Sequence, residues 1–512
     1  MKYLVIAAYF AVLLAIGAAA SRRVRGMADY YVGGKRLGYW VVAFSARASG
    51  ESAWLYLGLT GLGALVGARA FWIVVGELVG VAIAWFCMAG PFKAATDRYD
   101  SITIPDFLVS RFGRSGGERP ARALRLVSAV ALALFVTIYV SAQIDATGKA
   151  FHGFLDWNYH LGAFVGFAIV VAYTLSGGFI AAAWSDLFQG VLMLVGLAVL
   201  PLAAGVMLAD QPGSWLSALP IGHASLWGDG GASLSNALII VSYLAIGLGF
   251  LGSPQVFVRF IAIRDQGEIR AGRWVAIVFT IVTDGCAVLG GMLGYALLVG
   301  AGGDFTAVLG ADGEKVLPEL VSHLFPTVIV GLYVAAVLAA IMSTIDSLLL
   351  VASSAITRDV YQQIWRPEAR PERLTGLSRA TTLALAALAL LVALTVSIMS
   401  PDRTIFWYVI FGWAGIGATF CPVIVLALAW KRYNVWGALA SMITGAACIP
   451  LFKFAVPLIP TWGPIVSQAE EFAPSFFLAL IAGALATLAT SDKTGADAPR
   501  PEPSEANREN RR

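Results

Sequence analysis

Long apolar segments recur along almost the whole chain, and they constrain the fold more than any other feature. They lie at residues 3–20, 38–64, 71–91, 123–148, 161–180, 184–209, 235–260, 274–300, 324–351, 380–399, 404–430, 435–456 and 474–490. Each is close to the roughly 20 residues that an α-helix needs to cross a bilayer. A β-barrel would show short strands of alternating polarity instead. The segments therefore predict an all-α integral membrane protein with about 13 transmembrane helices.

The composition agrees and excludes several classes of function. The chain is 59% hydrophobic and 13% charged, whereas soluble proteins are about a quarter charged. Its four cysteines and four histidines show neither CxxC spacing nor paired ligands on a helix, which argues against a disulfide framework or a metal enzyme. A GxxxxGK[ST] motif is absent, so the sequence gives no sign of an ATP-driven pump. We expect no enzymatic activity, no nucleic-acid partner and no obligate protein partner; the expected surroundings are a lipid bilayer.

The basic residues predict an orientation. If the N-terminus is outside, 28 of the 35 lysines and arginines fall in cytoplasmic segments and four fall in outside loops. The positive-inside rule then places the C-terminus in the cytoplasm. The expected location of the protein is a bacterial-type inner (plasma) membrane. The first segment resembles a signal peptide, but the arginines that follow it directly favour a retained helix. Residues 1–490 are expected to form one membrane domain, and the polar, proline-rich residues 491–512 a disordered cytoplasmic tail.

The stretch 331–362 carries polar groups in the middle of an apolar helix. Ala340, Ser343, Thr344 and Ser347 share one helix face, with Asp346 at its edge. Such hard oxygen ligands suit a small hard cation, and a carboxylate inside a membrane needs a partner, a cavity or an ion. The alternative is that the hydroxyls only bond to carbonyls of their own helix or tighten packing.

Two of the apolar segments are interrupted in a comparable way. The first break is expected between Ser45 and Trp54, around Gly50, and the second between Ile246 and Pro254. Five segments separate their starts, an odd number, so the two copies would lie inverted in the membrane. Paired broken helices of this kind are typical of transporters with a binding site near the midplane. Glycines that only permit close helix packing are the alternative.

Arg47 and Glu51 lie four residues apart in the first broken segment. At this spacing they can form an ion pair, and either would be costly alone at that depth. Two interpretations stay open. The pair only stabilises the break, or Arg47 is free to meet a substrate carboxylate.

Several stretches, taken together, resemble a known family. They are Ala28–Gly61, Ile102–Gly113, Ser176–Gly190, Met342–Tyr361 and Cys421–Gly445. In this order they are similar to the sodium:solute symporter family, in particular its sodium/proline symporters. The resemblance implies a five-plus-five inverted-repeat (LeuT-like) core with broken first and sixth core helices. Its repeats would cover about 38–209 and 235–430.

The resemblance also implies sodium sites. The main site is expected at Ala48, Glu51, Ala340, Ser343 and Thr344. A possible second sodium site involves Asp186, Asp346 and Ser347. Asp186 is equally compatible with an ordinary carboxylate at a helix start.

For the solute, the resemblance implies an import site that differs from that of the proline carriers. The expected solute-binding residues are Arg47, Gly50, Ser52, Trp54, Phe250 and Pro254. Proline carriers have an aspartate at the position of Gly50, and Trp and Tyr at those of Ile246 and Phe250. The expected function is sodium-coupled symport of an amino acid such as proline or of another small carboxylate. The alternatives are proton coupling through Asp186, Asp346 or Glu51, and a non-transporting solute sensor on the same fold.

Overall fold

The computed structural model describes residues 1–22, 27–210, 214–369 and 371–490, and these residues are almost entirely helical. Within these ranges the chain has no β-strand beyond an isolated bridge between Leu37 and Ile263. The predicted all-α fold class is thereby confirmed. The predicted tail 491–512 lies outside the described residues.

The main helices follow the chain in order. They are α1 Lys2–Ser21, α3 Tyr39–Ala53, α4 Thr60–Val66, α5 Phe71–Ile83, α6 Ala89–Arg98, α7 Ile104–Gly116, α8 Glu118–Leu155, α9 Tyr159–Ala209, α10 Leu234–Ala245, α11 Pro254–Ala262, α12 Gln266–Leu298, α14 Val316–Leu324, α15 Thr327–Ser354, α16 Pro371–Met399, α17 Ile405–Ala429, α18 Val435–Pro450 and α20 Phe472–Thr490. Shorter helices α2 Met27–Val32, α13 Phe305–Leu309 and α19 Gly463–Val466 lie in the connections.

Among the described residues, 11 helices are long and apolar enough to cross a membrane. One of them, Tyr39–Arg98, covers two predicted spans, because the turn around Gly67 joins them without a long gap. The predicted span 161–180 corresponds to a shorter apolar helix, Tyr159–Ala172, which α9 continues past a non-helical residue at Gly178. The number of 13 transmembrane helices stays a prediction.

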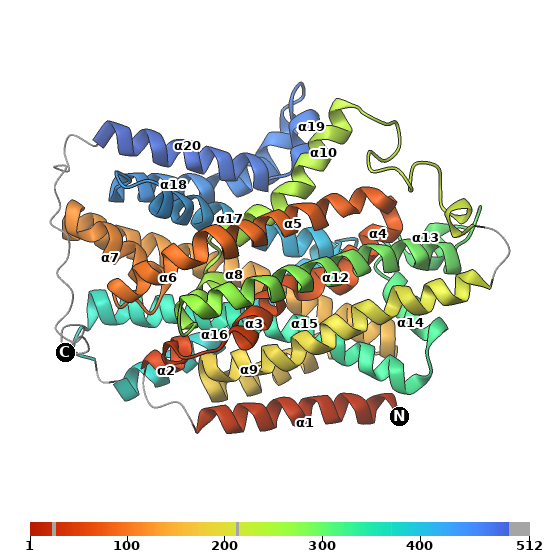
Figure 1. Cartoon of the computed structure of the whole chain (residues 1–512), viewed down its shortest axis with the longest axis horizontal. Helices are drawn as coiled ribbons and strands as arrows, with labels where there is room; N and C mark the ends of the chain where they lie inside the picture. The colour runs from red at the N-terminus through yellow and green to blue at the C-terminus, as the bar shows by residue number, and fades with distance from the viewer. Residues whose placement is uncertain (23–26, 211–213, 370, 491–512) are drawn as a thin grey trace.

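The long helices run roughly side by side, with α1 along one edge of the bundle and α20 along the opposite edge (Figure 1). Helix α15 occupies the interior, where it packs against α1, α3, α8, α9 and α16. Every residue from Tyr333 to Ala355 is buried. The helix that carries the polar stretch is therefore surrounded by other helices, and its polar face must meet protein groups.

The first predicted break is present in α3, but it lies at Ser52 (φ 59°, ψ −167°) instead of Gly50. Such a conformation is costly for a residue with a side chain and persists only when its surroundings hold it. Gln143 of α8 supplies that support, since its amide donates to the Ser52 hydroxyl at 3.3 Å and accepts from the Ala53 backbone at 3.0 Å. Tyr139 also donates to Ser52, at 3.3 Å.

The second predicted break is also present, between α10 and α11. A 3-10 turn, Ile246–Leu251, leads to Gly252 and then to Pro254, the first residue of α11. Side chains of α17 bond to the carbonyls that the break releases. Trp413 donates to the Ile246 carbonyl at 3.0 Å and Cys421 to the Gly249 carbonyl at 3.2 Å. Each break is therefore braced by a neighbouring unbroken helix, as buried irregular backbone requires.

Glu314 lies in the loop before α14 and joins three parts of the chain. Its carboxylate accepts hydrogen bonds from Lys149 of α8 at 2.7 Å and from the Ile405 amide at the start of α17. Asp312 lies 3.8 Å from the same lysine. Burial raises the pKa of Glu314 to about 7, and the Lys149 charge opposes part of that rise. The group therefore titrates in the physiological range.

We expect the substitution Glu314→Gln to remove part of the pH dependence of stability. A carboxyl group with a raised folded pKa binds its proton more tightly in the folded state. The stability it contributes is therefore present at pH 4.5 and below and is lost as the pH rises through about 7, a loss on the order of 3 kcal/mol. Thermal unfolding in detergent between about pH 5 and pH 8 measures this loss. The exposed Glu319, replaced by Gln, is the matched control, and equal pH slopes in the wild type and Glu314→Gln would contradict the assignment.

Candidate cation and solute site

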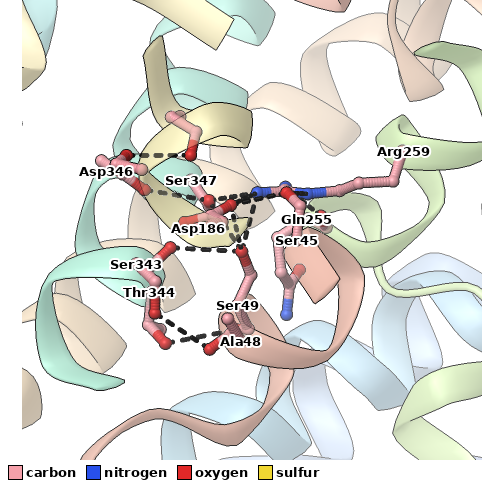
Figure 2. A network of polar contacts seen from close by, with 12 residues as sticks. Ser45, Ala48, Ser49, Asp186, Gln255, Arg259, Ser343, Thr344, Asp346 and Ser347 are labelled. Carbon is pink, nitrogen blue, oxygen red and sulfur yellow. Dashed lines mark hydrogen bonds and ion pairs between the residues drawn. The ribbon is translucent and has the colours of Figure 1, made fainter. Parts of the chain in front are cut away.

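Four of the five predicted cation ligands, Ala48, Ala340, Ser343 and Thr344, converge near the first break (Figure 2). The Ser343 hydroxyl lies 3.0 Å from the Ala48 carbonyl and 3.1 Å from the Ala340 carbonyl. The Thr344 hydroxyl lies 3.3 Å from the Ser49 carbonyl and 3.2 Å from the same Ala340 carbonyl. Five uncharged oxygens thus gather between two helices that are far apart in the sequence.

The break in α3 explains why a carbonyl is available there. In a continuous helix the Ala53 amide would bond to the Ser49 carbonyl four residues earlier. In this structure the Ala53 amide donates to Gln143 instead. Hard oxygen atoms in this number are the ligand type that a small hard cation requires. The site's residues therefore fit sodium by their chemistry.

Glu51, the remaining predicted ligand of the main site, has its side chain elsewhere. Its carboxylate contacts the guanidinium of Arg47, the ion pair expected from their spacing. Ser49, which was not predicted, contributes the carbonyl next to Thr344. A role for the Glu51 backbone as a sodium ligand stays a prediction.

The residues predicted for a second sodium site surround an arginine. Arg259 of α11 reaches into the group, with its Nη2 3.0 Å from Asp186 Oδ2 and in contact with the Ser347 hydroxyl (Figure 2). Ser347 in turn donates to Asp346 Oδ1 at 3.0 Å. The same guanidinium donates to Ser49 at 2.7 Å. Asp186 and Ser347 thus contact the Arg259 side chain directly, and Asp346 joins the group through Ser347.

Sequence reasoning missed Arg259 because it lies at the end of the apolar segment 235–260 and was counted with the basic residues that predict the orientation. The structure places it within α11, 0% exposed. Its position five residues after Pro254, in the same apolar segment as the second break, was the available signal. Ser45, which accepts from Arg259 Nε at 3.0 Å and donates to Asp186 at 2.5 Å, was named only as the limit of the first break.

The predicted solute residues separate into two groups. Gly50, Phe250 and Arg47 lie together, since a Cβ atom at Gly50 would approach the Phe250 ring to 2.7 Å and the Arg47 guanidinium lies 4.6 Å from the centre of that ring. Trp413 of α17 also packs against Phe250, with ring centres 4.9 Å apart. Phe250 of the second break thus contacts Gly50 and Arg47 of the first broken helix.

The other predicted solute residues take structural contacts. Trp54 donates to the Gly50 carbonyl at 3.3 Å and meets Phe406 edge to face. Ser52 is the non-helical residue of the break. Pro254 starts α11 and is buried. Their roles in solute binding stay predictions.

Two broken helices inside an all-helical bundle, one of which gathers uncharged oxygens with the unbroken helix α15, are typical of an ion-coupled secondary transporter. Comparison with known proteins gives the family. The model of the sodium:solute symporter family matches residues 30–445. This chain therefore belongs to the sodium:solute symporter family, and its class of function is sodium-coupled symport.

Individual relatives agree with this assignment. The osmoregulated proline transporter OpuE of Bacillus subtilis (strain 168) is 35% identical over 483 residues, 94% of this chain and 93% of the relative. The sodium/proline symporter of Escherichia coli (strain K12) is 34% identical over 445 residues, 86% of this chain and 85% of the relative. A solved structure of a Na⁺-coupled sialic acid symporter, substrate-bound and outward-open, superposes with a TM-score of 0.75 at 17% identity, covering 98% of this chain and 99% of the other. The last similarity shows a shared fold.

Proposed function

We propose that this protein imports a small carboxylated solute, of the size of an amino acid such as proline, together with sodium by alternating access. The observation that carries the proposal is the convergence of the Ala48, Ser49 and Ala340 carbonyls with the Ser343 and Thr344 hydroxyls at the break of α3. The names of the bacterial relatives supply the solute class. Multi-pass insertion in the bacterial inner membrane follows from the family, and an outside N-terminus is part of the proposal.

In this mechanism sodium joins α3 to α15 and holds the first break in the geometry that receives solute. Arg47 lies in the same helix, directly before Ala48 and Ser49, whose carbonyls are two of the cation oxygens. A solute carboxylate that bonds to Arg47 would therefore depend on the geometry of the same break. Coupling between two ligands is reciprocal, so sodium must raise the affinity for solute by the same factor by which solute raises the affinity for sodium. Opening toward the cytoplasm then releases both.

The proposed domain organisation is one membrane domain, residues 1–490, with inverted repeats at about 38–209 and 235–430. The two braced breaks support this division, because each repeat would contain one of them. A second sodium at Asp186, Asp346 and Ser347 is part of the proposal only for a state in which Arg259 withdraws from these groups.

The test is a thermal-shift screen of the purified protein against amino acids and small carboxylates, in sodium and in potassium. A ligand that binds only the folded state raises its melting temperature. We expect at least one carboxylated solute to stabilise the protein in sodium and to lose most of that effect in potassium. Equal stabilisation in both salts that varies with pH would replace sodium coupling by proton coupling.

A further inference from the structure

A second cluster of buried charges lies beside Phe250 and Gly50, two of the predicted solute residues. Arg47 and Glu51 of α3 meet Glu77 of α5 and Asp284 of α12, and each of these side chains is at most 1% exposed. One oxygen from each of the three carboxylates lies within 4.8 Å of the other two. Three negative charges thus share one guanidinium. Because like charges repel strongly away from water, the cluster needs additional positive charge when its acids are ionised.

The contacts leave buried donors and acceptors unused. Arg47 faces the carboxylates through a single nitrogen, Nη2, which lies 3.0 Å from Glu77 and 3.9 Å from Asp284 and contacts Glu51. Among the described residues, Arg47 Nε and Nη1 have no hydrogen-bond acceptor. Glu51 Oε2 and Asp284 Oδ2 likewise have no donor. Unused buried polar atoms are costly and require an explanation.

The cluster lies next to the second break, to which Phe250 belongs. The Phe250 ring covers the Arg47 guanidinium at 4.6 Å, and Gly50, one turn along α3, leaves room for that ring. N–H groups and carboxylate oxygens without hydrogen-bond partners therefore occur in one cluster beside an aromatic ring. A ligand that carries both a carboxylate and an ammonium group complements this arrangement, with its carboxylate on Arg47 and its ammonium among the acids.

We propose that the solute is a basic amino acid or a related carboxylate with two cationic nitrogens, recognised by Arg47 together with Glu51, Glu77 and Asp284. This inference rests on the proposed symport function and narrows its solute class. A neutral zwitterion such as proline adds no net charge, so it leaves the excess of two negative charges in place. A second ammonium group adds one positive charge and three N–H donors that can meet several carboxylates at once.

Protons on the acids are the competing source of positive charge. A proton joins only the two carboxylates that share it, and it leaves Arg47 Nε and Nη1 without an acceptor. The solute carboxylate satisfies these nitrogens, which is why the geometry favours a ligand with both kinds of group. One remaining negative charge can then be neutralised by a single shared proton.

The experiment is a thermal-shift titration of the full-length protein in sodium with L-lysine, L-norleucine, L-proline and cadaverine. Norleucine matches lysine without its side-chain amine, and cadaverine lacks the carboxylate. We expect lysine to half-saturate at a concentration at least tenfold lower than the other three. In Asp284→Asn and Glu77→Gln the advantage of lysine over norleucine should shrink, whereas Arg47→Gln should weaken both. Glu319→Gln, at an exposed position, is the matched control.

Three results would overturn this inference. If proline or norleucine binds in sodium with the same affinity as lysine, the solute is not a basic amino acid, and the proposed symport still stands. If cadaverine, which lacks the carboxylate, half-saturates at the same concentration as lysine, Arg47 does not bind a solute carboxylate. If low pH alone stabilises the protein, to the same extent with every solute, protons and not the solute supply the positive charge that the three carboxylates need. By contrast, a lysine effect that is the same in potassium and sodium would contradict sodium coupling and support the solute class.

Discussion

Replacing Arg259 by methionine will destabilise the protein by about 3–5 kcal/mol, the usual cost of removing one member of a buried ion pair. Asp186, 0% exposed, then loses its positive partner 3.0 Å away. The hydroxyls of Ser45 and Ser49 lose a donor as well. Denaturant unfolding in detergent measures the difference. The double variant Arg259→Met with Asp186→Asn should recover a large part of it, because the buried charge is then absent.

Arg264→Met provides the control for this prediction. Arg264 has 58% of its side chain exposed and lies five residues further along the chain. Surface substitutions away from special features usually change stability by about 0.5 kcal/mol or less. If Arg259→Met is as stable as Arg264→Met, the Asp186 carboxylate does not depend on the guanidinium, and the ion pair is not a structural requirement.

Removing the hydroxyl of Ser343 or Thr344 will lower the affinity for sodium at least tenfold, about 1.4 kcal/mol. Each substitution, Ser343→Ala or Thr344→Ala, deletes one of the five oxygens that converge on the break of α3. The apparent affinity for solute should fall with it, because the two ligands are coupled. Sodium titrations of thermal stability, with and without solute, measure both effects.

The matched control for these variants is Ser353→Ala on the same helix. Ser353 is buried like the two site residues, and its hydroxyl donates to the Leu350 carbonyl of α15 at 3.1 Å. We expect its sodium titration to match that of the wild type. A similar loss of sodium affinity in all three variants would indicate a general effect on α15 and would contradict the cation site.

Much of the candidate site was predictable because helical spacing is local information. Ala340, Ser343 and Thr344 share a face by periodicity alone, and the two breaks follow from glycine, serine and proline within apolar segments. Their partners were less accessible. Ser49 became the neighbour of Thr344 because Gln143, some 90 residues away in sequence, takes the amide that would have occupied its carbonyl. The spacing of residues in α3 does not predict that contact.

The sequence by itself determined the class of molecule and the elements that carry the site. Apolar segments of membrane length, an internal polar face and two breaks are local properties, and burial of apolar surface in a bilayer decides their structure. Only the tertiary structure decided how the charges are paired. By sequence, Arg259 counts only as a basic residue at the end of an apolar segment, whereas in the structure it is buried and pairs with Asp186. Arg47 was expected to meet one acid and meets Glu77 and Asp284 as well. A buried charge is compensated by whatever helices packing brings within a few ångströms, and that distance is not encoded in the order of residues along one segment.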